Sequence, residues 1–163
     1  MAVEADLAKN LAITNGAEEP AAEYVGSSII HRRYVAVTDT HYVGGLVDGA
    51  FVLGLFADVA TEFCIRLDGD EGLFASYDDV QFLAPVRSGD IIEAEATLVR
   101  LGGRSRRFRF EARVVCRSDP DRILSSSRVL NDPLVVATGE GTVVVPVGSN
   151  DDGREPQDSE IKS

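Results

Sequence analysis

Hydrophobic residues recur with helical spacing from residue 45 to residue 67. Positions three, four and seven apart fall on one side of an α-helix, so the pattern predicts a long helix with a buried face. The apolar positions of this stretch are Leu46, Val47, Phe51, Val52, Leu55, Val59 and Phe63. The acidic segment DGDEG at residues 68–72 ends the pattern, and we expect a solvated turn there.

Other stretches are rich in β-branched residues or alternate between apolar and polar positions, which is typical of strands. They are residues 28–38, 73–86, 90–102, 106–117 and 133–147. Short breaks at RSGD and GGR suit hairpin connections, whereas residues 118–133 indicate a longer surface loop. The sequence therefore predicts an α+β fold in which one long helix packs on an antiparallel sheet.

Alternation within the strands indicates which side chains face the helix. These positions are Ile92, Ala94, Ala96 and Leu98, then Phe108, Phe110, Ala112 and Val114, and finally Val135, Ala137, Gly139, Gly141, Val143 and Val145. Small residues in the middle of the last strand would leave room for the helix backbone to lie close. The opposite face carries acids and arginines, so it can be solvated or can meet another subunit.

Acidic residues outnumber basic residues by 11, and most of the excess lies at the two ends of the chain. Residues 1–26 hold five acids and one base, and residues 148–163 hold five acids and two bases. We interpret the first segment as a flexible or partly helical lead, with a short helix near residues 6–12, and the last as a disordered acidic tail. One domain would then span residues 27–147.

The acidic balance argues against nucleic acids and membranes as partners, because those polyanionic surfaces need a contiguous basic face. The first residues are acidic where a secretory leader would be basic, and no apolar run approaches about 20 residues, so we expect a cytoplasmic protein. Cys64 and Cys116 lack the spacing of a metal or redox pair, which favours reduced core cysteines. The motifs of serine hydrolases, zinc proteases and nucleoside triphosphatases are absent.

Carboxylates interrupt the predicted helix, where burial disfavours an unpaired charge. Asp48 lies in the expected first turn, and Asp58 and Glu62 form an i,i+4 pair. In the ordinary interpretation Asp48 caps free backbone amides and the other two face water. In the functional interpretation, amides near Gly45 and Gly49 hold a developing oxyanion while a carboxylate moves a proton.

His41 precedes the glycine pair and would overhang the start of the helix. It is either a loop histidine bonded to the backbone or a general acid or base, since imidazole changes charge near neutral pH. His31, inside the first predicted strand, favours a structural role. Asp48 lies about 15 Å along the axis from Asp58 at ~1.5 Å per residue, so the two can act together only across subunits.

Several short motifs occur in order along the chain. They are HYVGGLVDGA at 41–50, LFADVATE at 55–62, DGDEGLF at 68–74, YDDVQFLAPV at 77–86, SGD at 88–90, SRRFRFEA at 105–112 and GEGTVVVP at 139–146. In these motifs the chain resembles the hotdog-fold superfamily, and within it the branch of ammonia-lyases that act on β-aminoacyl-CoA thioesters such as 3-aminobutyryl-CoA or β-alanyl-CoA. The resemblance covers about residues 38–147.

The resemblance implies an antiparallel sheet wrapped around one long helix in a homodimer, with a trimer of dimers as the larger option. It implies a carbon–nitrogen lyase that reversibly removes ammonia from a short β-aminoacyl-CoA or carrier-protein thioester through an enolate. Asp48 or Glu62, from one or both subunits, would take the α-proton, and His41 or the remaining acid would handle the amine. Coenzyme A enters as part of the substrate, and no metal or organic cofactor is needed.

Coenzyme A would bring phosphates to the basic run after the third strand. Arg104, Arg106 and Arg107 would pair with phosphate oxygens, and Ser105 would contact the pantetheine arm. The ordinary interpretation is a solvated strand face whose arginines pair with Glu93 and Glu95. The alternatives are thioester hydrolysis, enoyl thioester hydration and a non-catalytic acyl-CoA binder. Related thioesterases often carry a catalytic acid where this chain has Phe56. This difference argues against thioester hydrolysis.

Overall fold

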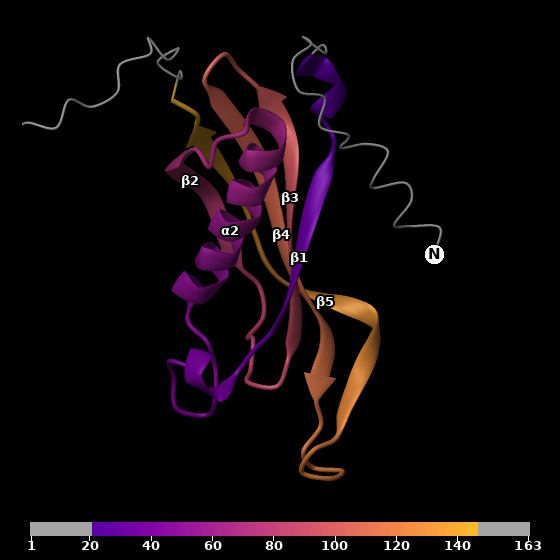
Figure 1. The fold of residues 1–163 in the computed structure, drawn as a ribbon. Helices are drawn as coiled ribbons and strands as arrows, with labels where there is room; N and C mark the ends of the chain where they lie inside the picture. The colour runs from indigo at the N-terminus through magenta and orange to yellow at the C-terminus, as the bar shows by residue number, and fades with distance from the viewer. Residues whose placement is uncertain (1–20, 147–163) are drawn as a thin grey trace, which may run out of the picture.

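The predicted helix lies across one face of an antiparallel sheet in the computed structural model, which describes residues 21–146 (Figure 1). The elements are η1 (Ala21–Tyr24), β1 (Ser28–Tyr34), η2 (Val37–Asp39), α2 (Gly49–Asp68), β2 (Leu73–Phe82), β3 (Ile91–Leu101), β4 (Ser105–Ser118) and β5 (Ser127–Val144). The five strands follow the order β1-β3-β4-β5-β2, and neighbours pair antiparallel. The predicted architecture is confirmed.

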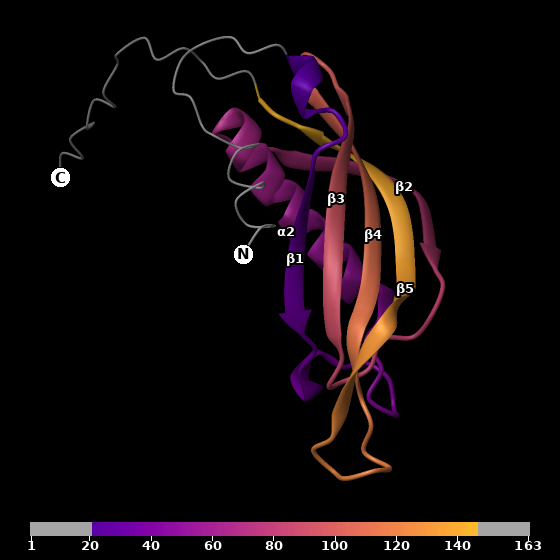
Figure 2. The same cartoon turned by 90° about the vertical axis from the view of Figure 1, so that its right-hand side faces the viewer.

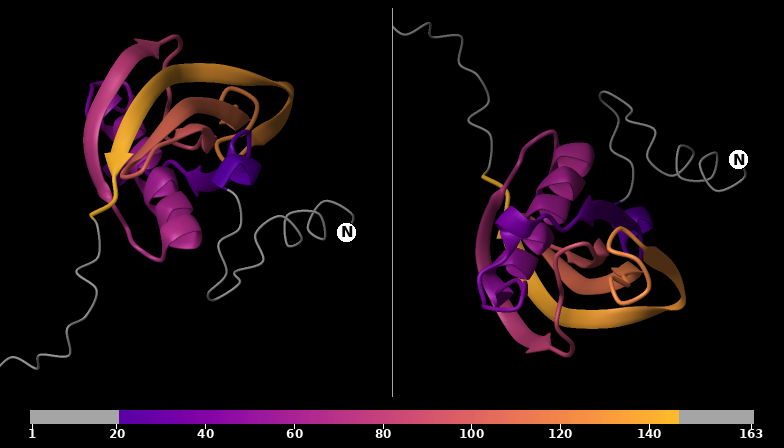
Figure 3. Two further views of the ribbon diagram at one scale, coloured as in Figure 1. Left: turned by 90° about the horizontal axis from the view of Figure 1, so that it is seen from above. Right: turned by 90° about the horizontal axis from the view of Figure 1, so that it is seen from below.

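Aromatic side chains join α2 to the middle of the sheet. Figure 2 shows α2 lying behind the strands, and Figure 3 shows the sheet curving around it. The ring of Phe56 stacks on Phe110 with centroids 4.9 Å apart, and Phe63 meets Phe108 edge-on at 5.2 Å. All four rings are buried. These contacts fix which face of α2 points inward and therefore where its N-terminus lies.

The predicted inward faces of β3 and β4 are confirmed, and that of β5 is confirmed except at its start. The chosen residues of β3 and β4 are buried, as are those of β5 from Ala137 onward. At the start of β5, Val136 is buried and Val135 is only partly so. The pairing register shifts there, since Ala112 faces Ala137 while Arg113 faces Val135. A bulge inserts one residue and reverses the alternation on one side of it.

The small residues of β5 make room for side chains and not for the helix backbone, so that prediction is wrong. A Cβ added to Gly141 would lie 2.7 Å from the ring of Phe74 and 3.0 Å from that of Phe110. A Cβ at Gly139 would lie 3.3 Å from a methyl group of Val80. The glycines therefore accommodate the neighbouring strands β2 and β4.

The helix begins at Gly49, four residues after the predicted start. Gly44 and Gly45 adopt positive φ angles of 94° and 74°, which ordinary residues avoid. Leu46 then forms an isolated bridge with both Tyr42 and Arg87. The apolar residues before Asp48 thus fit the helical period but belong to a bridged loop.

The predicted surface loop at 118–133 is in large part a continuation of the sheet. Cys116, Arg117 and Ser118 pair with Val129, Arg128 and Ser127, respectively. β5 therefore begins at Ser127, six residues before the predicted start, and residues 119–126 form the hairpin end. Figure 1 shows this β4–β5 arm projecting beyond the rest of the sheet, on the side where α2 begins.

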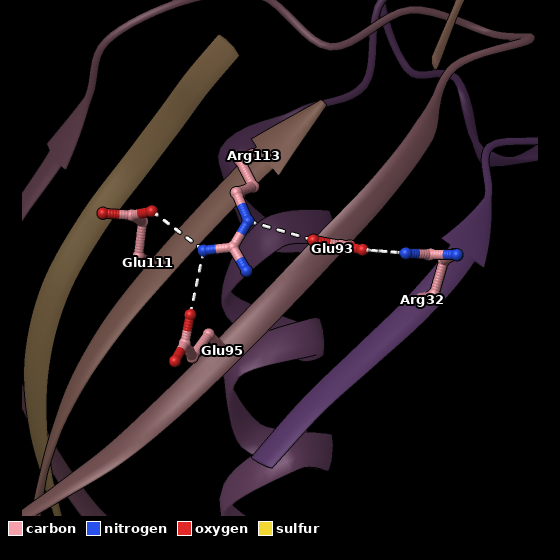
Figure 4. A network of polar contacts seen from close by, with 5 residues as sticks. All are labelled: Arg32, Glu93, Glu95, Glu111 and Arg113. Atoms are coloured by element: carbon pink, nitrogen blue, oxygen red, sulfur yellow. Dashed lines mark hydrogen bonds and ion pairs between the residues drawn. The ribbon is translucent and has the colours of Figure 1, made fainter. Parts of the chain in front are cut away.

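The face of the sheet turned away from α2 carries a network of ion pairs (Figure 4). Arg113 donates to Glu93 at 2.9 Å, to Glu95 at 2.9 Å and to Glu111 at 3.1 Å, and Arg32 bonds the other side of Glu93. Burial raises the pKa of Glu93, but the hydrogen bonds from Arg32 and Arg113 outweigh it and hold that pKa below its ordinary value. The network ties β1, β3 and β4 together on this face.

Several sequence predictions fall at the chain ends or concern single residues. The short helix near residues 6–12 and the tail at 148–163 lie outside the described residues, so the limits of the 27–147 domain stay a prediction. Cys64 is free and buried, which raises the pKa of its thiol to about 12, while Cys116 is free but only partly buried. Within residues 21–146, no helix combines the length and apolar character needed to cross a bilayer.

Candidate active site

Asp48 uses its two carboxylate oxygens differently at the start of α2. Its Oδ1 accepts the backbone N–H of Phe51 at 2.9 Å, which is the capping contact of the ordinary interpretation. Its Oδ2 lies 3.8 Å from Nδ1 of His41. The side chains of Asp48 and His41 are 32% and 63% exposed, so both reach solvent. The structure therefore brings these two predicted residues together and leaves one carboxylate oxygen free of the cap.

A tight loop holds His41 beside Asp48. The backbone amides of His41 and Tyr42 both donate to the carbonyl of Leu46, at 2.9 and 3.0 Å. The amide of Gly45 donates to the carbonyl of Tyr42 at 3.2 Å. The turn thus already uses the proton of the Gly45 amide in this conformation, so its oxyanion role stays a prediction that requires this bond to open. The Gly49 amide is among the first of the helix, which have no acceptor within the helix.

A groove of about 520 Å³ opens beside these residues. Its lining is Tyr42, Val47, Asp48, Gly49, Val52, Phe82, Leu83, Ala84, Pro85, Val86 and Val136. Asp48 is the one carboxylate in that lining, and most other members are apolar. A Cβ at Gly49 would lie 2.6 Å from Cζ of Phe82, so glycine lets the aromatic ring rest on the first helical residue. The groove can hold a small apolar group against the helix N-terminus.

The wall of the groove from Phe82 to Val86 was not predicted as part of the site. In the sequence these residues continue an apolar strand pattern, which indicates a core position equally well. The motif SGD that follows was interpreted as a hairpin break and as part of the family resemblance. The hairpin interpretation is wrong, because β2 and β3 are not neighbours in the sheet. Pairing of Leu46 with Arg87, which joins this segment to the helix start, leaves no mark in local sequence.

Glu62 does not lie at the helix start. Residue 62 is fourteen positions beyond residue 48, or about 21 Å along the axis at ~1.5 Å per residue. Its Oε2 bonds Nε2 of His31 on β1, and its Oε1 accepts from Nε of Arg66 at 2.6 Å. Glu62 therefore bridges the helix to the edge strand of the same subunit, in keeping with the structural role expected of His31.

Asp58 is exposed on the same helix, about 15 Å from Asp48 at ~1.5 Å per residue. Its negative charge interacts electrostatically with Tyr77, whose hydroxyl donates to the carbonyl of Leu53 at 2.6 Å. Burial, with a smaller contribution from Asp58, raises the pKa of Tyr77 to about 12. Neither Asp58 nor Glu62 shares the groove with Asp48 in one subunit.

Replacing Glu62 with Gln separates a structural from a catalytic role. Burial raises the pKa of Glu62, but hydrogen bonds from His31 and Arg66 prevail and hold it below its ordinary value of 4.5. A lowered folded-state pKa stabilises the protein above the unfolded-state pKa, and this contribution is lost as pH falls through the folded value. We expect Glu62→Gln to lower the unfolding free energy by about 0.5–1 kcal/mol at pH 7, with the difference shrinking as pH falls below the ordinary value of 4.5 and lost below the lower folded-state pKa.

Urea unfolding at several pH values measures this difference, and Glu71→Gln on the exposed turn after α2 is the control, with a change below about 0.5 kcal/mol at every pH. Turnover of Glu62→Gln should stay within about threefold of the parent protein, since general base loss costs ~100-fold or more. A larger loss would return Glu62 to the mechanism.

The predicted coenzyme A run lies at the other end of α2. Arg106 is 9% exposed and donates to Asp68, the last residue of α2, at 2.9 and 2.5 Å. This hydrogen bond, ahead of the charge itself, raises the pKa of Arg106. α2 has 20 residues, or about 30 Å at ~1.5 Å per residue. Within one subunit, this run and the groove therefore lie one helix length apart.

The four residues of that run have different surroundings. Arg106 is engaged with Asp68, so its contact with a phosphate stays a prediction that requires this pair to open. Arg107 lies on a charged strand face, as in the ordinary interpretation, but it pairs with Glu140 at 2.8 Å and Asp78 at 2.6 Å and not with Glu93 or Glu95. Arg104 is exposed at the hairpin and Ser105 is half-buried. The side chains of Arg104 and Ser105 therefore remain accessible to a ligand.

Metal ligands do not gather in the described part of the chain. Among residues 21–146 no three His, Cys, Asp or Glu side chains come close enough together to hold a metal ion. In the acidic turn after α2, Oδ1 of Asp70 accepts the amide of Gly72 at 2.7 Å, as expected of a local turn.

Comparisons with known proteins agree with this fold and place it in a family. A family model described as Thioesterase superfamily matches residues 44–119. The 3-aminobutyryl-CoA ammonia lyase of Acetoanaerobium sticklandii is 54% identical over 108 residues, which cover 66% of this chain and 86% of that protein. The structure of beta-alanyl-CoA:ammonia lyase from Clostridium propionicum matches with a TM-score of 0.70 and 32% identity, over 74% of this chain and 86% of that one.

A more distant solved structure shares the fold alone. The hexameric hotdog fold thioesterase of Campylobacter jejuni is 21% identical, with a TM-score of 0.60 over 72% of this chain and 81% of that one. The resemblance to the ammonia-lyase branch is confirmed. The chain belongs to the hotdog-fold family that contains 3-aminobutyryl-CoA ammonia lyase.

Proposed function

We propose that this protein is a carbon–nitrogen lyase that reversibly eliminates ammonia from a short β-aminoacyl-CoA, with 3-aminobutyryl-CoA as the first substrate to test. The observation that carries the proposal is the 54% identity to an ammonia lyase across 86% of that enzyme. The groove supports it, because an apolar lining with one carboxylate at a helix N-terminus suits a small acyl group and a proton transfer.

The chemistry needs a base and a place for negative charge. The base takes an α-proton, and the electron pair moves into the thioester carbonyl as an enolate. When the carbonyl re-forms, the α,β double bond forms and the bond from the β-carbon to the nitrogen of the protonated amine breaks, which releases ammonia. The proton then passes to ammonia, so the products are enoyl-CoA and ammonium. The thioester is itself the electron sink, so these steps call for no metal or organic cofactor.

We assign the base to Asp48. It lies in the groove, and its Oδ2 is not used by the cap, whereas Glu62 is bonded to His31 and Arg66 far along the helix. The enolate oxygen would lie at the Gly49 amide, where free N–H groups and the helix dipole favour negative charge. His41, 3.8 Å from Asp48, would carry the proton to and from the amine.

We further propose a homodimer as the working unit, with a trimer of dimers as the larger assembly. The groove and the exposed Arg104 lie at opposite ends of α2, so an extended CoA bound in the groove meets that run only if a second copy lies antiparallel to the first. β2 is an unpaired edge of the described sheet, and Leu73 and Phe82 on it are exposed. Light scattering on the purified protein measures the assembly, and a stable monomer would contradict this part.

One assay tests the reaction against its alternatives. Crotonyl-CoA and ammonium are incubated with the protein while enoyl absorbance, free thiol and product mass are followed. Loss of enoyl absorbance with an amine adduct and no thiol supports the lyase. Thiol release would instead identify a thioesterase, the activity for which the matching superfamily is named. A water adduct would identify a hydratase, and the absence of any product would reject the proposed substrate class.

A further inference from the structure

A buried ion pair lies behind the wall of the groove. Arg117 of β4 donates two hydrogen bonds to Asp90, from Nε to Oδ1 at 3.1 Å and from Nη2 to Oδ2 at 2.8 Å. Asp90 has no solvent exposure, and 15% of the Arg117 side chain is exposed. Such a pair is weak evidence for stability by itself, because desolvation offsets much of the attraction. Its contacts with the backbone show what else it holds.

The pair ties both ends of one turn, residues 85–90. Nη2 of Arg117 also donates to the carbonyl of Pro85 at 2.9 Å, and Oδ2 of Asp90 accepts the amide of Arg87 at 2.9 Å. Gly89, at a φ of 86°, packs so tightly that a Cβ there would lie 2.9 Å from Cβ of Ser118, the neighbour of Arg117. The turn is therefore set against β4 by side chain, backbone and packing contacts together.

The other side of the turn holds the segment that leads into α2. The amide of Val47 donates to the carbonyl of Val86 at 3.1 Å, and the amide of Ser88 donates to the carbonyl of Gly45 at 2.9 Å. Val47 directly precedes Asp48, and Val86 lines the groove. Contacts thus run without a break from Arg117 through the turn to the backbone that carries the Asp48 carboxylate.

We propose that the Asp90–Arg117 pair is a positioning device for the reaction: by fixing the 85–90 turn, it sets the place of Asp48 relative to the bound acyl group. This inference rests on the proposed lyase function. Asp48 can move a proton only if its free oxygen lies within hydrogen-bond reach of the α-carbon proton. A misplacement of about 1 Å far from the reacting atoms can lower a rate by ~100-fold.

Replacing Arg117 with Lys tests the device. The ammonium keeps the charge beside Asp90 but cannot make the paired bonds to Asp90 and the bond to Pro85 at once. We expect turnover per folded protein to fall about tenfold while KM stays within about twofold, since the groove remains but the base is misplaced. A purely structural pair would lower the melting temperature and leave turnover below that temperature unchanged, and this result would overturn the inference.

Arg113→Lys is the matched control. Arg113 lies on the same strand and bonds three carboxylates, but on the face away from α2 and without contact to the 85–90 turn. We expect this variant to lose stability and to keep turnover. Equal losses of turnover in the two variants would show a general loosening of β4 and would overturn the inference.

Hydrogen exchange gives a readout that needs no activity. The amides of Val47 and Ser88 should exchange about tenfold faster in Arg117→Lys than in the parent and should be unchanged in Arg113→Lys, because their bonds join the turn to the helix start. If the parent protein lacks lyase activity, the proposed function fails while exchange still decides the linkage. Unchanged exchange would overturn the inference. Should Arg117→Lys not fold, Asp90→Asn, which keeps an acceptor for the Arg87 amide, is measured in the same way.

Discussion

Asp48→Asn is expected to lower lyase turnover at least about 100-fold while the fold stays intact. The carboxamide cannot take the α-proton, but its oxygen can still accept the amide of Phe51, which Oδ1 of Asp48 now accepts at 2.9 Å. Asn and Asp cap helices about equally, so the unfolding free energy should change by less than about 1 kcal/mol, most of it from the lost charge at the helix N-terminus. Initial rates at saturating 3-aminobutyryl-CoA, followed by enoyl absorbance, and thermal unfolding measure the two effects.

Asp70→Asn makes the same chemical change at the opposite end of α2. Oδ1 of Asp70 accepts the amide of Gly72 in an exposed turn, so turnover should be that of the parent protein. Asp48→Ala adds a comparison, since loss of the cap should cost about 1 kcal/mol of stability beyond the loss of activity. Near-normal turnover of Asp48→Asn would remove Asp48 from the mechanism and leave the groove without a base.

Regular burial made most of the fold predictable. From Phe51 to Phe63 the apolar residues follow the helical period, and in β3 Ile92 and Leu98 follow the strand period, because each element hides one continuous face. The β4–β5 arm has no such face. Around Val129, which is 73% exposed, the strands pair outside the core, so no alternation marks them and polar composition indicates a loop.

The helix start and the site were predictable only where the chemistry is local. Asp48 and His41 are seven residues apart, so the sequence could place His41 over the start of the helix, and the turn at Gly44 and Gly45 brings the two side chains together. The same pattern could not show that Gly45 uses its own amide in that turn. Backbone hydrogen bonds within irregular loops depend on the particular turn, which hydrophobic spacing does not encode.

Long-range pairing explains why the sequence did not show the partners of the other candidate residues. Glu62 meets His31 across 31 positions, and Arg106 meets Asp68 across 38. The local sequence around a charged residue in an apolar pattern is the same whether that residue binds a ligand or is neutralised by a distant side chain. The resemblance to the ammonia-lyase family supplied the reaction, but it did not distinguish arginines that are already paired from those that are accessible.

Arg106→Met is expected to lower the unfolding free energy by about 3–5 kcal/mol, because it leaves Asp68 largely buried without a partner. The Asp68 side chain is 14% exposed, and the carboxylate lies at the C-terminus of α2, where the helix dipole opposes a negative charge. The KM for the CoA substrate should stay within about twofold, since a side chain engaged with Asp68 adds little to phosphate binding. Urea unfolding and steady-state kinetics on the folded protein measure these two quantities.

Arg104→Met is the matched control in the same run. Its side chain is exposed at the β3–β4 hairpin, so stability should change by less than about 0.5 kcal/mol. The double variant Arg106→Met with Asp68→Leu should recover most of the lost stability, because an apolar pair of similar volume removes the unpaired charge. If Arg106→Met kept full stability and raised the KM tenfold, Arg106 would be a coenzyme A ligand after all, and the Asp68 contact would be one that substrate displaces.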